Sequence, residues 1–89
     1  VRYSSASALA RRVRALTPWP GTFVPWQGDT LKVLKAHPAA GRAAPGATLR
    51  HQGLPALGCA EGLLVLDEVQ LPGKKAMPGN AFLQGVRNW

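Results

Sequence analysis

The sequence predicts a mainly β fold with a short helix at each end, and three observations favour it. The chain has 89 residues, 46% of them hydrophobic, so residues 1–89 are expected to form a single domain with a modest core. It holds 10 Gly and 8 Pro but only 17% charged residues, which is typical of short strands joined by turns. Five short apolar segments separated by turn residues then predict a small OB-like β-barrel.

The first element expected is an amphipathic helix that ends at Thr17. Ser4 and Ser5 can cap its start by accepting hydrogen bonds from its first free N–H groups. One apolar stripe is formed by Leu9, Val13 and Leu16. The basic residues largely off this stripe are Arg11, Arg12 and Arg14. Thr17 ends the helix because the residue before a proline disfavours helical geometry.

Five strands are expected after this helix. They run from Thr22 to Trp26, Thr30 to His37, Ala47 to His51, Leu54 to Cys59 and Leu63 to Leu71. Pro25 places the first at a sheet edge or a bulge, and the fifth, the longest apolar run, is expected in the centre. In the second strand Lys35 is expected on the side of Leu31 and Val33, although the imperfect alternation leaves open which lysine faces solvent.

Two further segments complete the prediction. Residues 38–46 contain only Ala, Gly, Pro and Arg42, which favours a mobile loop. Pro78-Gly79-Asn80 offers a cap for a short terminal helix from Ala81 to Gly85.

The charge balance indicates a negatively charged partner. Lys and Arg number 11 against 4 Asp and Glu, a net charge of +7, and Asp29 is the one acid before residue 60. This imbalance favours a nucleic acid or an anionic surface as partner, with a merely basic soluble domain as the alternative. The Pro72-Gly73 turn also places Lys74 and Lys75 side by side, where like charges gain nothing for folding.

The sequence offers few residues that could serve in catalysis or metal binding. His37 and His51 have no acid nearby in sequence, and His37 is expected to be a solvated surface residue. The scattered acids make no general acid/base pair, and the single cysteine, Cys59, is expected to be a buried thiol in a reducing compartment. We expect no catalytic, metal-binding or cofactor-binding residue, and no apolar run approaches the ~18 residues that a membrane span needs.

The three tryptophans are candidates for stacking on bases. Trp19 lies between two prolines and is expected to pack as an anchor against the first helix. Trp26 and Trp89 remain open between packing and stacking, and Met77 is expected to fill a gap in the core.

Five segments together match the pattern of one known family. They are Val13 to Gly21, Leu31 to Ala36, Pro45-Gly46, Val69 to Met77 and Phe82 to Gly85. In order and spacing they resemble the C-terminal domain of the methionyl-tRNA formyltransferases. Pro18-Trp19-Pro20-Gly21 and Gly73-Lys74-Lys75-Ala76-Met77 are specific in combination. The chain departs from the family at Ala60-Glu61-Gly62, where Gly-Asp-Gly is usual.

The resemblance implies an OB-like barrel that follows a Rossmann-type catalytic domain, which this chain lacks. In that family the catalytic domain binds 10-formyltetrahydrofolate and transfers its formyl group to initiator Met-tRNA, while the C-terminal domain holds the tRNA. The implied partners are initiator Met-tRNA and the N-terminal catalytic domain of the same protein. The implied location is the bacterial cytoplasm, with an organellar form left open. The start without Met is as expected of an excised fragment.

The expected tRNA-binding residues combine family positions with other basic residues. The resemblance marks Arg14, Lys32, Lys35, Lys74 and Lys75. Arg11 on the helix and Arg50 on the third strand complete the set.

Two alternatives stay open. One is a free-standing OB-type module that binds single-stranded nucleic acid by stacking, prefers single strands to tRNA and loses binding on Trp26→Ala. The other is the accessory domain of another folate-dependent formyltransferase, acting on a sugar or folate, which would have no affinity for tRNA.

Overall fold

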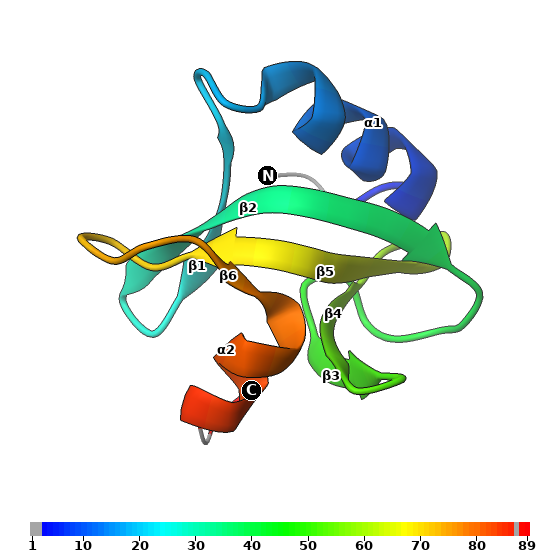
Figure 1. Ribbon diagram of the computed structural model, residues 1–89. Helices are drawn as coiled ribbons and strands as arrows, with labels where there is room; N and C mark the ends of the chain where they lie inside the picture. Colours follow the sequence, from blue (N-terminus) through cyan, green and yellow to red (C-terminus); the bar gives the residue numbers. More distant parts are fainter. Residues whose placement is uncertain (1–2, 87) are drawn as a thin grey trace.

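The computed structural model describes residues 3–86 and 88–89, and these form a six-stranded sheet with a helix at each end of the chain (Figure 1). The elements in order are α1 (Ala6–Leu16), β1 (Thr22–Trp26), β2 (Asp29–Ala39), β3 (Thr48–His51), β4 (Leu54–Gly58), β5 (Leu63–Gln70), β6 (Met77–Pro78) and α2 (Gly79–Gly85). The predicted mainly β fold with two short helices is confirmed.

The strands follow the order β1-β2-β5-β4-β3, and β6 pairs with β5 beside this path. The ladders between these strands are antiparallel. β5 is central and β1 lies at an edge, as predicted, so Pro25 takes the edge position that its missing N–H requires. Among the described residues no ladder joins β1 to β3 or β4, so closure into an OB-like barrel stays a prediction.

Four strand ends differ from the sequence-based expectations by one residue each, and three differences are larger. β2 continues through Pro38 to Ala39, which were expected in the loop, because β5 extends far enough to pair Leu63 with Ala39. The two-residue strand β6 was not predicted, and its pairing with β5 defines it. α2 begins at Gly79 rather than Ala81.

α1 forms as its sequence pattern predicts. The Ser5 side chain accepts a hydrogen bond from the backbone N–H of Ala8 at 3.3 Å. Leu9 and Val13 are buried, and α1 packs mainly on β2. The Thr17 N–H and hydroxyl both donate to the carbonyl oxygen of Val13, at 3.1 and 2.6 Å, which closes the helix end.

The core joins α1, the sheet and α2. Its largest fully buried side chains include Phe82, Leu31, Leu64, Leu66, Val13, Val24, Val33, Val65 and Val69. The Phe82 ring meets Trp26 and Trp89 edge to face, with centroids 5.3 and 5.5 Å apart. The Trp89 indole N–H also donates to the carbonyl of Leu49 at 2.8 Å. Both tryptophans that sequence reasoning left open therefore have packing roles, and Met77 packs against the core as predicted.

Candidate nucleic-acid interface

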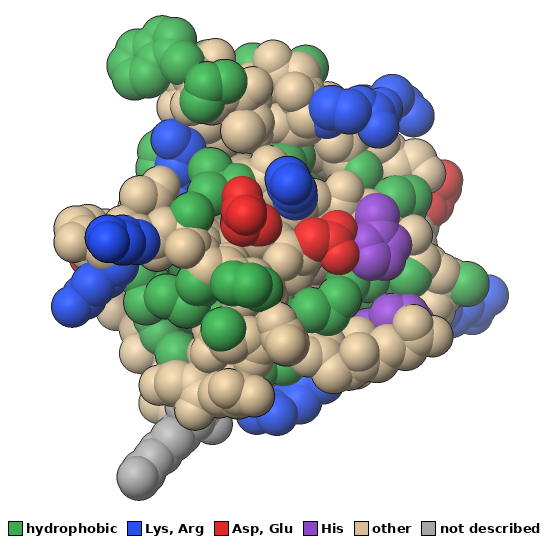
Figure 2. All heavy atoms as spheres, in the orientation of Figure 1, with side chains coloured by type: hydrophobic (Ala, Val, Ile, Leu, Met, Phe, Trp, Pro, Cys, Tyr) green, Lys and Arg blue, Asp and Glu red, His purple; other side chains and the backbone are tan. Residues whose placement is uncertain are grey.

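The seven basic residues predicted to bind tRNA come from four elements or turns. Lys32 is half-buried, and the six exposed ones are Arg11, Arg14, Lys35, Arg50, Lys74 and Lys75. Figure 2 shows Lys and Arg side chains in separate groups on one face, with acidic and histidine side chains between them. The structure thus divides the predicted set instead of gathering it into one patch.

Three lysines, Lys32, Lys74 and Lys75, form what we name the turn group. Lys74 N–H donates to the carbonyl of Leu71 at 3.0 Å, and Gly73 has a φ of +70°. Pro at the second position and Gly with positive φ at the third are the pattern of a type II turn. Gln70 donates its side-chain N–H to the carbonyl of Lys74 at 2.8 Å. The Cα of Gln70 pairs with that of Lys32, so Lys32 lies beside the base of the turn.

The ammonium group of Lys32 is held in place. Its Nζ donates to the carbonyl of Pro18 at 3.3 Å and lies 5.9 Å from the centroid of the Phe23 ring, within cation–π range. Lys32 and Phe23 line a cleft of about 310 Å³ together with Gln70 and residues 71–73. The Lys32 ammonium therefore lies at a cleft that is also lined by the Pro72-Gly73 turn, which precedes Lys74 and Lys75.

Three further cations, Arg11, Arg14 and Lys35, form the helix group. Arg11 and Arg14 are three positions apart on α1, so their side chains are neighbours on the helix surface. Arg14 and Lys35 line one cleft of about 290 Å³ with Asp67. β2 thus supplies one lysine to each of the two groups.

The structure answers which lysine of β2 faces solvent, a question that the imperfect alternation left open, and it does not keep Lys35 with Leu31 and Val33. Leu31 and Val33 are buried, whereas Lys35 is exposed. The β2–β5 ladder shifts register between Val33 and Lys35 and again between Lys35 and Ala36. A bulge of this kind interrupts the two-residue alternation of a strand, and Lys35 therefore faces solvent.

β5 brings acids to the helix group, which local sequence does not reveal. Glu68 is the register partner of Lys35. The carboxylate of Asp67 lies 2.7 Å from Nδ1 of His37, 30 positions away in the chain. His37 is exposed, as predicted, but the antiparallel pairing supplies the acid partner that its sequence neighbours lack. The helix group therefore has acidic neighbours on β5, whereas the register partner of Lys32 in the turn group is the uncharged Gln70.

Arg50 lies apart from both groups. It belongs to β3, at the end of the sheet path opposite β1, with β4 and β5 between it and β2. Its Cα partner is Pro55 of β4. The structure does not bring Arg50 together with the other six residues, and its contact with tRNA stays a prediction.

Trp19 is 83% exposed, so its predicted role as a packing anchor is wrong. The N–H of Gly21 donates to the carbonyl of Leu16 at 2.8 Å, which closes a tight connection and leaves Trp19 on its outer side. Figure 2 shows hydrophobic atoms projecting from the molecule where Figure 1 places the α1–β1 connection. The signal was present in the sequence, because a residue between two prolines is typical of a turn rather than a regular element.

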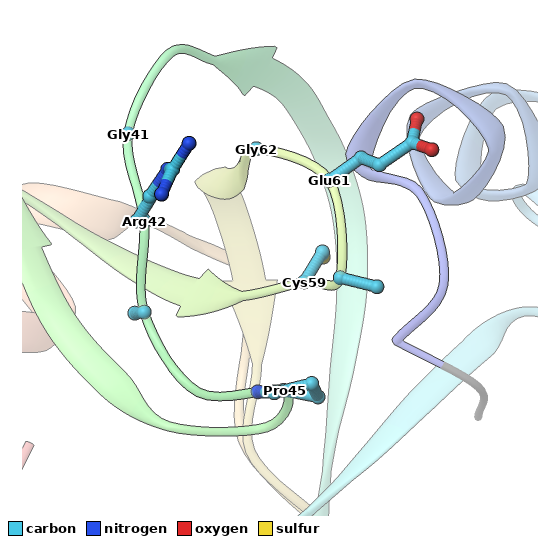
Figure 3. Close-up of a pocket in the computed structure, with 8 residues that line it drawn as sticks. Gly41, Arg42, Pro45, Cys59, Glu61 and Gly62 are labelled. Atoms are coloured by element: carbon cyan, nitrogen blue, oxygen red, sulfur yellow. The ribbon is translucent and has the colours of Figure 1, made fainter.

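A hollow of about 580 Å³ lies beside Cys59, between residues 41–45 and 59–62 (Figure 3). Arg42 points toward the segment that carries Gly62, whereas Glu61 points away toward α1. Burial raises the pKa of the Cys59 thiol, and a backbone hydrogen bond at Leu64 offsets this in part. A thiol kept neutral in this way is a poor nucleophile. The predicted burial of Cys59 is confirmed, with 3% of the residue exposed.

The described ranges, 3–86 and 88–89, contain no group of three or more His, Cys, Asp or Glu side chains placed to hold a metal ion. Neither helix within them has the length and apolar content needed to cross a membrane.

Comparison with known proteins identifies the family. Residues 3–87 match the family model described as "Formyl transferase, C-terminal domain". Methionyl-tRNA formyltransferases of Acidiphilium cryptum, Thermus thermophilus and Granulibacter bethesdensis are 40%, 43% and 45% identical over 82, 83 and 82 residues. These alignments cover 92%, 91% and 90% of this chain but 27%, 27% and 25% of the relatives, so the chain spans about a quarter of their length. The resemblance inferred from the sequence motifs is confirmed, and the chain belongs to the family of formyl transferase C-terminal domains.

Proposed function

We propose that this chain is the tRNA-holding part of a cytoplasmic methionyl-tRNA formyltransferase. The relatives bear that name and are far longer than this chain. Formyl transfer from 10-formyltetrahydrofolate to initiator Met-tRNA then belongs to the catalytic domain outside these 89 residues. In this proposal the chain positions the tRNA and supplies no reacting group.

The observation that carries the proposal is the pair of basic groups connected by β2. The turn group contributes Lys32, Lys74 and Lys75, and the helix group contributes Arg11, Arg14 and Lys35. Each phosphate that a cation neutralises releases condensed counterions, so these groups favour binding to an RNA backbone. Phosphate contacts carry no sequence information, so the identity of the initiator tRNA is read elsewhere in the protein.

The packing of Trp26 argues against the alternative that this chain is a free-standing module that binds single-stranded nucleic acid by stacking bases on Trp26. That alternative needs Trp26 to stack on bases, but the Trp26 ring packs edge to face on Phe82, which is 1% exposed. Trp26→Ala would therefore weaken the core whatever the chain binds. The other alternative, an accessory domain for a sugar or folate, differs from our proposal by having no affinity for tRNA.

Charge reversal in the turn group tests the proposal. Lys74 and Lys75 are exposed, so Lys74→Glu combined with Lys75→Glu should leave the fold intact. Each phosphate contact changes log K by about 0.7–0.9 per tenfold change in salt. If the two proteins bind initiator tRNA equally at 1 M salt, the loss of two phosphate contacts makes the affinity of the double variant about 25- to 60-fold lower than that of the wild type at 0.1 M salt. Filter binding measures this difference.

A matched control is the single reversal Arg42→Glu, compared with Lys74→Glu. Arg42 is also exposed but lies in the loop after β2, outside both groups. We expect Lys74→Glu to weaken tRNA binding several-fold more than Arg42→Glu. Equal effects would indicate a response to net charge alone and would count against a specific tRNA-holding surface.

A further inference from the structure

An exposed aromatic residue stands beside the turn group without a packing role. Within the described residues, the large hydrophobic side chains exposed to solvent are Trp19, at 83%, and Phe23, at 45%. Trp26 and Trp89, by contrast, both pack on Phe82. Folding therefore uses two tryptophans and leaves the indole of Trp19 on the surface.

The connection that carries Trp19 is fixed at both ends. Thr17 N–H donates to Val13 O at 3.1 Å and Gly21 N–H to Leu16 O at 2.8 Å. Pro18 and Pro20 restrict the backbone on either side of Trp19. An aromatic ring on such a restrained connection loses little backbone freedom when a ligand binds, which favours affinity.

A positive charge is attached to the same connection. The Lys32 ammonium donates to the carbonyl of Pro18, the residue before Trp19, at 3.3 Å. The aliphatic part of Lys32 passes over Gly21, since a Cβ built there would lie 2.7 Å from Lys32 Cε. The cleft that Lys32 and Phe23 line then extends to the turn that precedes Lys74 and Lys75. Trp19 is therefore adjacent in sequence to the carbonyl that holds the Lys32 ammonium, and Lys32 lines a cleft that reaches the turn before Lys74 and Lys75.

We propose that Trp19 stacks on an unpaired base of a bound RNA, while Lys32 neutralises a phosphate next to that base. Aromatic side chains beside a positively charged groove are the arrangement that binds single-stranded nucleic acid. A protein surface covering Trp19 would also bury the ammonium of Lys32, which is costly without an anionic partner. A phosphate supplies that partner, so RNA fits this surface better than an apolar protein face. The inference rests on the proposed function, in that the ligand is an RNA.

The test uses the 89-residue chain with two probes, a single-stranded oligoribonucleotide of about ten nucleotides and a fully paired duplex containing the same sequence. Trp19→Ala should lower affinity for the single strand about 5- to 150-fold, the range for loss of one stacked base. Its affinity for the duplex should stay unchanged, and Trp19→Phe should retain most of the single-strand affinity. Thermal unfolding of each variant verifies that the exposed position tolerates the change.

Tryptophan fluorescence gives a second readout. The single strand should quench the wild-type chain and a Trp89→Phe control, but not Trp19→Phe, which lacks the exposed indole. Unchanged single-strand affinity in Trp19→Ala, or quenching that survives Trp19→Phe, would overturn the stacking proposal. Acrylamide quenches the fluorescence of exposed tryptophans. If the separately added catalytic domain, but not RNA, protects Trp19 from this quenching, the stacking proposal is overturned in favour of a protein contact.

The two proposals fail in different ways. If Lys74→Glu with Lys75→Glu weakens tRNA binding while Trp19→Ala changes nothing, stacking is refuted and tRNA holding stands. If the wild-type chain binds neither tRNA nor either probe, the proposed function is refuted and stacking with it.

Discussion

Gly79 is the position where adding one methyl group should most strongly disturb the packing that holds the turn before Lys74 and Lys75. It is buried where β6 meets α2, and a Cβ there would overlap the carbonyl oxygen of Leu66 on β5 and lie 2.9 Å from Pro55 Cδ. A backbone carbonyl cannot rotate away as a side chain can. Gly79→Ala must therefore push α2 and β6 from the sheet, and β6 anchors the turn group through its pairing with Val69.

Overpacking of this kind costs about 1–3 kcal/mol, and we expect the upper part of that range because the obstacle is backbone. A stability of ~0.05–0.15 kcal/mol per residue gives this chain about 4–13 kcal/mol, so the loss is substantial. Gly85→Ala is the matched control in the same helix. A Cβ at Gly85 would meet nothing within 4 Å, and alanine's helix propensity should raise stability by up to ~1 kcal/mol.

Urea unfolding followed by circular dichroism measures both variants. With an m-value of about 1 kcal/mol per molar urea, the midpoint of Gly79→Ala should fall by about 2–3 M, and that of Gly85→Ala should rise or stay. If the two alanines shift the midpoint equally, or if Gly79→Ala is neutral, the close approach of α2 to β5 is wrong.

Two further predictions concern the core. Phe82→Ala should lower the free energy of unfolding by about 3–5 kcal/mol, whereas Phe82→Leu should lose mainly the two edge-to-face contacts, at about 0.5–1.5 kcal/mol each; equal losses in urea unfolding would contradict this. Burial raises the pKa of the Cys59 thiol above its ordinary 9.0, so its stabilisation is complete below the pKa of the unfolded thiol and is lost as pH rises through the folded pKa. The thermal unfolding midpoint of the wild-type chain should therefore fall above pH 9, and that of Cys59→Ala should fall by less. Burial also raises the pKa of Tyr3, so the decrease that Tyr3 causes remains in both proteins. An identical decrease in the two proteins would rule out the thiol as a cause.

Local signals explain what the sequence could predict. The serine cap, the apolar stripe and the proline after Thr17 all act within a few residues, and α1 has the bounds that they imply. Two hairpin turns lie at Gln-Gly pairs, where glycine is a local turn signal. Gln27-Gly28 and Gln52-Gly53 have positive φ at both residues, which is the geometry that matches the twist of two-residue hairpins.

Register and long-range contact explain what the sequence could not predict. The bulge that turns Lys35 outward and sets it opposite Glu68 depends on how β2 meets a strand about 30 positions away. β6 exists only through its pairing with β5. Pro18 and Pro20 indicate that Trp19 lies in a turn, but whether another element covers its ring depends on tertiary packing, which leaves it exposed here.

Grouping of the basic residues is also a tertiary property. Lys32 lies beside the turn at Pro72-Gly73 because its strand pairs with β5, whereas Arg50, which is also basic, lies on β3 at the far end of the sheet. A count of charges predicts a partner, but the order of the strands decides which charges can contact it together.

The dependence of tRNA affinity on salt tests phosphate binding by the two groups most directly. If all six cations of the turn group and the helix group contact phosphates, the logarithm of the tRNA association constant should fall with the logarithm of the salt concentration with a slope of about −4 to −5. Lys74→Glu with Lys75→Glu should flatten that slope by about 1.4–1.8, while Arg42→Glu should leave it unchanged. A wild-type slope near zero, or the same slope in the wild type and the double variant, would contradict binding of tRNA through its phosphates at this surface.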